Sequence, residues 1–124
     1  MSNKSSSDIL RKYIVKIENI KILNIFEIID DFASALSLIL YKRMKELYKT
    51  DPLLILIEKP KKFYEGLVAI MKDKETVSLL LDLLARRISS LKNVLVKKED
   101  ILIAFKTNNS DLVIKIFSVE TEEE

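Results

Sequence analysis

The chain has 124 residues, of which 48% are hydrophobic and 32% charged, and these proportions are typical of one globular domain. It contains no cysteine and no histidine, which excludes disulfide and thiolate chemistry, Ser-His-Asp triads and most zinc sites. The formal net charge of +2 gives only weak support for a nucleic-acid partner.

The sequence predicts three segments: a flexible leader at 1–8, one globular domain at 9–119 and an acidic tail at 120–124. Without the four glutamates of that tail, 21 basic residues face 15 acidic ones, so the domain itself is basic. Because no run reaches the ~20 apolar residues of a membrane span and the start is polar, we expect a soluble cytoplasmic protein without a membrane partner.

The first predicted elements are a strand and a helix. "KYIVKIENIKI" alternates apolar and polar residues and is rich in β-branched ones, which predicts a strand that bends near Asn19. Asn24 is a candidate N-cap and Glu27 follows three residues later, as in a capping box. The isoleucines and Phe32 after it have helical spacing, which predicts an amphipathic helix.

The middle of the chain contains two prolines whose positions indicate helix boundaries. Residues 34–48 fit either a continued helix or a short buried strand, because periodicity does not separate the two in short apolar runs. Pro52 suits the first turn of a helix capped by Asp51 or Thr50. That helix is expected to be interrupted or kinked at Pro60.

A leucine-rich helix is predicted from Thr76 to about Leu91. Its buried face is expected to hold Val77, Leu80, Leu81, Leu84, Ile88 and Leu91. Arg86 lies beside the solvent-exposed face of this helix, four residues after Asp82. An ion pair with Asp82 accounts for its presence there. Arg87 projects on the apolar flank, so its charge must pair, reach water or bind a ligand.

The end of the domain is predicted to be a β-hairpin. Two β-branched runs in "DILIAFKTNNSDLVIKIF" flank the turn-favouring Asn108, Asn109 and Ser110. With the strand and helices before it, this predicts an α/β (α+β) fold, in which a sheet and helices form a small sandwich.

Catalysis is not expected. The pairs Asp30-Asp31 and Glu99-Asp100 are sequence neighbours, whose side chains diverge on a helix. Gly66 is the only glycine, which excludes a glycine-rich phosphate loop and a dinucleotide fingerprint. The chain is therefore predicted to be no enzyme and to use no cofactor.

Two basic segments are candidates for binding nucleic acid or a partner. "YKRMKELYK" and "EKPKKFY" interleave tyrosines with Arg43, Lys61 and Lys62, a combination that can contact phosphates and stack bases. The alternative is that the aromatic rings pack in the core while the lysine stems lie across them.

The segment "VSLLLDLLARRISSLKNVLVKKEDILIAF" resembles part of the kinase-binding accessory subunit of the archaeal and eukaryotic KEOPS complex, which makes threonylcarbamoyladenosine in tRNA. "DPLLILIEKPKKFYEG" lies where that family has a helix, with Leu53, Leu54, Tyr64 and Glu65 at matching positions. "YIVKIENIKI" and "LSLILYKRM" look like its first two strands. The resemblance covers residues 10 to about 106.

This resemblance implies an α/β sandwich and a non-catalytic role: binding the atypical kinase subunit and helping to recruit tRNA. Arg86 matches the family's arginine, while Arg87 replaces its glutamine and Pro52 replaces its histidine. Two other functions stay open: a winged-helix DNA-binding regulator, and a helical dimerisation or adaptor module that forms a homodimer. The leucine-rich start of the helix at Thr76 argues against reading of a DNA groove.

Overall fold

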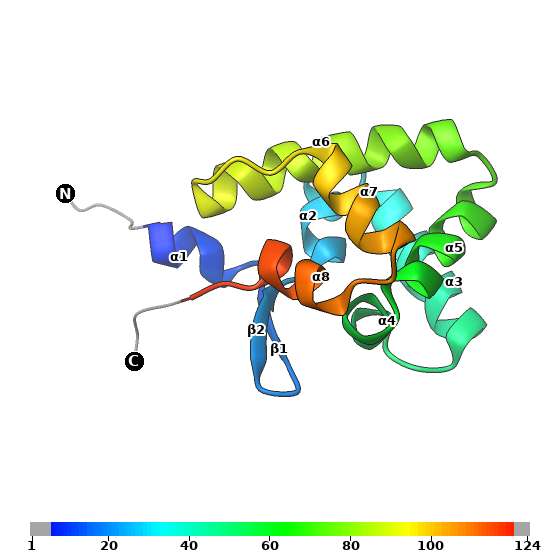
Figure 1. Ribbon diagram of the computed structural model, residues 1–124, viewed down its shortest axis with the longest axis horizontal. Helices are drawn as coiled ribbons and strands as arrows, with labels where there is room; N and C mark the ends of the chain where they lie inside the picture. Colours follow the sequence, from blue (N-terminus) through cyan, green and yellow to red (C-terminus); the bar gives the residue numbers. More distant parts are fainter. Residues whose placement is uncertain (1–5, 121–124) are drawn as a thin grey trace.

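The computed structural model describes residues 6–120, and of residues 6–8 only the backbone. This part of the chain is mostly helical, with a single two-stranded sheet near its start (Figure 1). Its elements follow in chain order: α1 (Ser6–Arg11), β1 (Ile14–Ile17), β2 (Ile20–Leu23), α2 (Ile25–Phe32), α3 (Ser34–Tyr48), α4 (Pro52–Glu58), α5 (Pro60–Met71), α6 (Lys74–Lys92), α7 (Lys98–Lys106) and α8 (Ser110–Phe117).

The strand predicted to bend near Asn19 is an antiparallel hairpin. β1 and β2 pair with Ile14 opposite Leu23, and the connecting residues Glu18 and Asn19 have φ angles of 49° and 70°. Two successive positive φ values are those of the tight turns that match the twist of a hairpin. The segment after α8 adds one more bridge, because Val119 N–H donates to the carbonyl of Lys21 at 2.9 Å.

Local signals set the starts of the helices that follow. The Asn24 side chain accepts from the N–H of Phe26 at 2.9 Å, which confirms the predicted N-cap of α2. The N–H of Asn24 donates to the carbonyl of Tyr13 and not to Glu27, so the second half of a capping box is missing. Residues 34–48, left open by the sequence, form the helix α3.

Each proline begins a helix. Asp51 caps α4 by accepting from Leu53 N–H at 3.0 Å, and the predicted break at Pro60 is the boundary between α4 and α5. Gly66 lets α5 approach α3 closely, since a Cβ there would lie 3.1 Å from the ring and hydroxyl of Tyr48. A methyl group at this position would require the end of the Tyr48 side chain to shift by a few tenths of an ångström.

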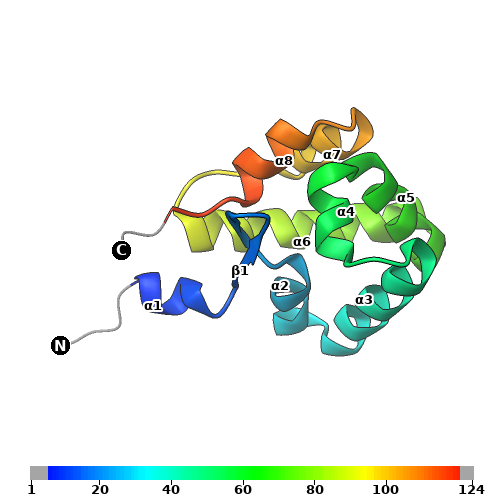
Figure 2. The same ribbon diagram turned by 90° about the horizontal axis from the view of Figure 1, so that it is seen from below.

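Helix α6 extends along one edge of the molecule in Figure 1, and the second view shows α7 and α8 on one side of it and α2 and α3 on the other (Figure 2). Five of the six residues predicted for its buried stripe are buried, and Leu91 is half-buried. Asp73 caps its N-terminus and Asn93, with φ 57°, ends it. The helix thereby joins the hairpin end of the molecule to the α3–α5 end.

The predicted C-terminal hairpin is wrong, because residues 98–117 form α7 and α8. The β-branched residues there fall at helical spacing and bury one face of each helix. That spacing decides the structure, since it packs both helices against the same core. The predicted turn is real, with φ 54° at Asn108, but Asn109 caps α8 by accepting from Leu112 N–H at 3.0 Å. The buried residues are Ile101, Ala104 and Phe105 in α7 and Val113, Ile116 and Phe117 in α8.

The α/β sandwich is therefore a wrong prediction, and so is the fold that the KEOPS resemblance implies. "LSLILYKRM" lies in helix α3 and "DILIAF" in helix α7, where that family would have strands. The predicted leader and acidic tail fall largely outside the described residues, although α1 already begins at Ser6. In residues 6–120, no helix combines the length and apolar character that crossing a membrane requires.

Candidate functional site

The two adjacent arginines of α6 point to different partners. Arg86 pairs with Asp82 one turn earlier at 3.1 Å, as the sequence predicts. Arg87 Nη2 donates to Asp31 in α2 at 2.7 Å and to the hydroxyl of Tyr13, which immediately precedes β1, at 3.1 Å. The partner that the position of Arg87 requires is thus supplied by the chain itself.

Asp31 is the centre of this polar cluster, which joins the α1–β1 connection, α2 and α6. Its carboxylate accepts from Arg87, from the Tyr13 hydroxyl and from Lys12 Nζ, the last at 3.3 Å. The side chain of Asp31 is 19% exposed and that of Arg87 is 39% exposed. The buried Nε of Arg87 has no hydrogen-bond partner in the described chain, which limits the net stabilisation.

The cluster shifts the acid–base behaviour of its members. Burial acts to raise the pKa of Asp31, but the hydrogen bonds from Tyr13, Arg87 and Lys12 outweigh it and hold that pKa below its usual value. The hydrogen bond to Asp31, together with burial, raises the pKa of Tyr13. The hydrogen bonds that cause these shifts connect three parts of the chain, so the cluster acts as an internal brace.

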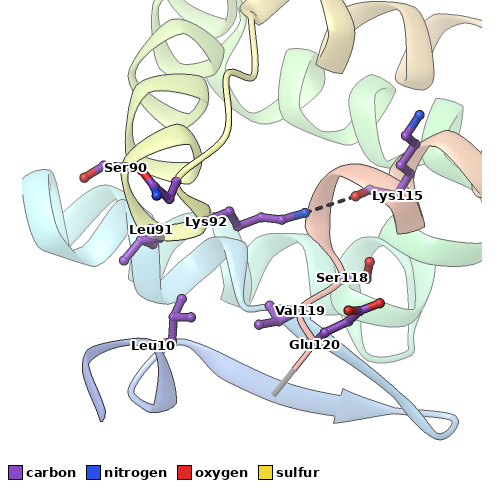
Figure 3. A pocket seen from close by; sticks show the side chains of 9 residues that line it. Leu10, Ser90, Leu91, Lys92, Lys115, Ser118, Val119 and Glu120 are labelled. Carbon is purple, nitrogen blue, oxygen red and sulfur yellow. Dashed lines mark hydrogen bonds between the residues drawn. The ribbon is translucent and has the colours of Figure 1, made fainter. Parts of the chain in front are cut away.

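A hollow of about 770 Å³ lies at the C-terminal end of α6 (Figure 3). Lys92 lies at its edge, and its ammonium donates to the backbone carbonyls of Lys115 and Ile116 at 3.0 and 2.8 Å. Burial lowers the pKa of Lys92, although Glu120 opposes that shift. Two of the three N–H donors of this ammonium bind carbonyls in the last turn of α8, so Lys92 stabilises the end of that helix.

A second hollow, of about 380 Å³, lies between α5, the start of α6 and the end of α7. Three exposed lysines line it, one from each helix: Lys61, Lys74 and Lys106. The remaining lining is Tyr64, Glu65, Val68 and Ala69, so an apolar floor lies between the positive charges. We call this the basic hollow.

Two hydrogen bonds hold the segments that form the basic hollow next to each other. Lys61 N–H, in the first turn of α5, donates to the side chain of Asn108 at 3.1 Å. The Ser110 hydroxyl donates to the carbonyl of Glu58 at 3.3 Å. Both bonds tie the α4–α5 junction to the α7–α8 turn, and so place Lys106 beside Lys61.

Tyr64 connects the floor of the basic hollow to the core. Its ring lies 6.2 Å from that of Phe105, and the ammonium of Lys106 lies 5.9 Å from the centre of the Tyr64 ring. Such a cation–π contact is weak at an exposed site, so Lys106 can leave the ring for a phosphate. The floor therefore offers an aromatic surface, and the Lys106 ammonium beside it is exchangeable.

Of the five residues nominated from the sequence, Lys61 alone lines the basic hollow. Lys62 is exposed, and its carbonyl accepts from the Tyr48 hydroxyl. Arg43 is exposed on α3, away from the residues that line the hollow. Sequence reasoning missed Lys74 and Lys106, and it placed Lys106 in a strand. Only a correct assignment of α7 would have brought Lys106 to Lys61.

In residues 6–120, no three acidic side chains are grouped so as to hold a metal ion. Comparisons with protein-family models, curated proteins and solved structures gave no match.

Proposed function

We propose that the protein is a non-catalytic RNA-binding module, and that the basic hollow is its contact with RNA. The observation that carries this proposal is the convergence of Lys61, Lys74 and Lys106 from three different helices on one hollow. Phosphate groups are the partners that such exposed ammonium groups bind best in nucleic acids.

The shape of the site favours a single strand over a duplex. Sequence reading in duplex DNA requires a protruding helix or ribbon that enters a groove, whereas this site is concave. An unpaired base can lie on Tyr64 between the lysines while its phosphates bind at the rim. Glu65 supplies one carboxylate to the lining, so the phosphates are expected on the side of the lysines.

The test is fluorescence anisotropy with a labelled, mixed-sequence, single-stranded RNA over a series of salt concentrations. The triple variant Lys61→Gln, Lys74→Gln and Lys106→Gln should weaken binding about ten-fold or more. It should also lower the slope of log K against log salt by about 2, at ~0.7 for each phosphate contact in single strands.

The matched control removes the same charge elsewhere. Lys16, Lys42 and Lys49 are exposed and do not line the basic hollow, so their triple change to Gln should alter affinity much less. Equal weakening by both triple variants would show that only net charge matters. Wild-type protein that fails to bind RNA at low salt would overturn the proposal.

The resemblance to the KEOPS accessory subunit supports a narrower version of this proposal, in which the RNA is tRNA and a protein partner is the atypical kinase. The narrower version rests on that resemblance alone, because the sandwich it implies is wrong for this chain. Co-purification with tagged kinase tests it, and failure of the kinase to retain this protein would contradict it.

The winged-helix alternative needs a C-terminal hairpin as its wing, and α7 and α8 occupy that part of the chain. We therefore do not propose it. The helical dimerisation module is compatible with the mostly helical fold and stays an alternative.

A further inference from the structure

One carboxylate lies among the three lysines of the basic hollow. It belongs to Glu65, an exposed residue of α5. The residues of α5 that line the hollow occupy positions i, i+3, i+4, i+7 and i+8 of one helical face: Lys61, Tyr64, Glu65, Val68 and Ala69. That face therefore presents the ring of Tyr64 and the carboxylate of Glu65 to the same ligand.

The carboxylate of Glu65 has no partner within residues 6–120. No ion pair or hydrogen bond in that part of the chain involves it, although Lys61 precedes it by four residues. A basic residue followed by an acidic one is the weaker order for such a helix pair. Asp82 and Arg86 have the stronger order, with the acid first, and they pair at 3.1 Å. The oxygens of Glu65 are therefore open to a ligand in the hollow.

The chemistry of a carboxylate limits what Glu65 can bind in RNA. It repels phosphates, so a base is the favourable partner, and its two oxygens accept hydrogen bonds only. On its Watson–Crick edge, guanine presents two adjacent donors, N1–H and the N2 amino group. Adenine and cytosine each present one amino group beside an acceptor nitrogen, and uracil presents one N–H between two carbonyl oxygens. Guanine alone therefore satisfies both oxygens, in the parallel two-bond geometry that arginine makes with carboxylates.

We propose that the basic hollow selects an unpaired guanine, with Glu65 accepting from its N1–H and N2 amino group while the base stacks on Tyr64. This inference rests on the proposed RNA function and adds the base that the site prefers. The three lysines of the hollow bind the flanking phosphates. Because phosphate contacts contain no sequence information, Glu65 is the residue that determines specificity.

The experiment is fluorescence anisotropy at low salt with short labelled uridine strands that differ only at one central base. That base is guanine, hypoxanthine, adenine or cytosine. The guanine strand should bind about five-fold more tightly than the adenine strand, at the lower end of what a bidentate contact discriminates, because the hollow is open to water. Both bases are purines, so the difference reports the edge contacts. Hypoxanthine keeps N1–H and lacks the amino group, so its strand should bind with intermediate affinity.

The variant Glu65→Gln separates base recognition from charge. A carboxamide has one acceptor oxygen beside its own N–H donors, so the ratio of guanine to adenine affinities should fall to about one. If Glu65 acted only as a negative charge, this variant would bind all four strands more tightly by the same factor. Glu46→Gln is the matched control, because Glu46 is exposed and does not line the hollow. It should leave the guanine preference unchanged.

Circular dichroism melting checks that both variants are folded. Equal wild-type affinity for the guanine and adenine strands, or a guanine preference that Glu65→Gln leaves unaltered, would overturn the guanine inference and leave the RNA function standing. Absence of binding to every strand would overturn the RNA function together with the inference.

Discussion

The two ends of α6 use positive charge in opposite ways. At the C-terminal end, Arg87 binds Asp31 and Tyr13, and Lys92 binds the carbonyls at the end of α8. At the N-terminal end, Lys74 lies in the lining of an open hollow with Lys61 and Lys106. Cations that are held by internal acceptors stabilise the fold, and cations around an open hollow remain available for an outside anion.

The largest expected effect is loss of stability when Arg87 is removed. Arg87→Ala should lower the free energy of unfolding by about 1.5 kcal/mol, because it leaves the carboxylate of Asp31, whose side chain is 19% exposed, without the guanidinium that binds it at 2.7 Å. Urea unfolding followed by circular dichroism measures this difference.

The neighbouring arginine is the matched control for that change. Arg86→Ala breaks only an exposed pair within one helix and should cost no more than about 0.5 kcal/mol. Equal losses for the two variants would mean that the Asp31 cluster does not brace the fold.

A smaller loss is expected at Lys92. Lys92→Met keeps most of the side-chain stem and removes the ammonium from the end of α8, which should lower stability by about 1 kcal/mol. Thermal unfolding of this variant beside Lys115→Met separates the two lysines of that hollow, since only the backbone of Lys115 contacts Lys92. A larger loss for Lys115→Met would contradict the role given to Lys92.

The Asp31 cluster also predicts a dependence on pH. Because the pKa of Asp31 is lowered in the folded state, its contribution is complete above its unfolded pKa of about 4 and is lost as the pH falls through the folded value. Urea unfolding of wild type and Asp31→Asn should therefore differ most near neutral pH. The difference should shrink below about pH 4, and a constant difference down to pH 2 would contradict this account.

The elements that the sequence predicts well are those with short-range signals. Asn24 and Asp51 accept hydrogen bonds from N–H groups two residues later, and Pro60 interrupts a helix wherever it lies. The pairing of Arg86 with Asp82 is also local. Each of these depends on neighbours within about one turn, so the amino-acid order contains the information.

The prediction of a C-terminal hairpin is wrong because it gives the β-branched composition more weight than the helical spacing of the apolar residues. Val113, Ile116 and Phe117 are β-branched or aromatic, yet they are buried together at the spacing of a helix. Propensity for strands is weak where tertiary packing selects a helical face.

The candidate site depends on contacts that are distant in sequence. The position of Arg87 predicts that it needs a partner. The sequence does not say which of several acidic residues that partner is, because Asp31 lies 56 residues away. Lys106 reaches Lys61 only through the helix α7 and the Asn108 hydrogen bond. Such pairings follow from the packing of whole helices, and one sequence does not specify that packing by local rules.

The most direct test compares one cation from each end of α6 by the same measurement, RNA binding by anisotropy at low salt. Lys74→Gln and Arg87→Gln each remove a single positive charge from this helix. The account predicts that Lys74→Gln weakens binding several-fold, whereas folded Arg87→Gln binds nearly as the wild type does. Equal weakening, or a larger loss for Arg87→Gln, would contradict the assignment of the basic hollow as the RNA contact.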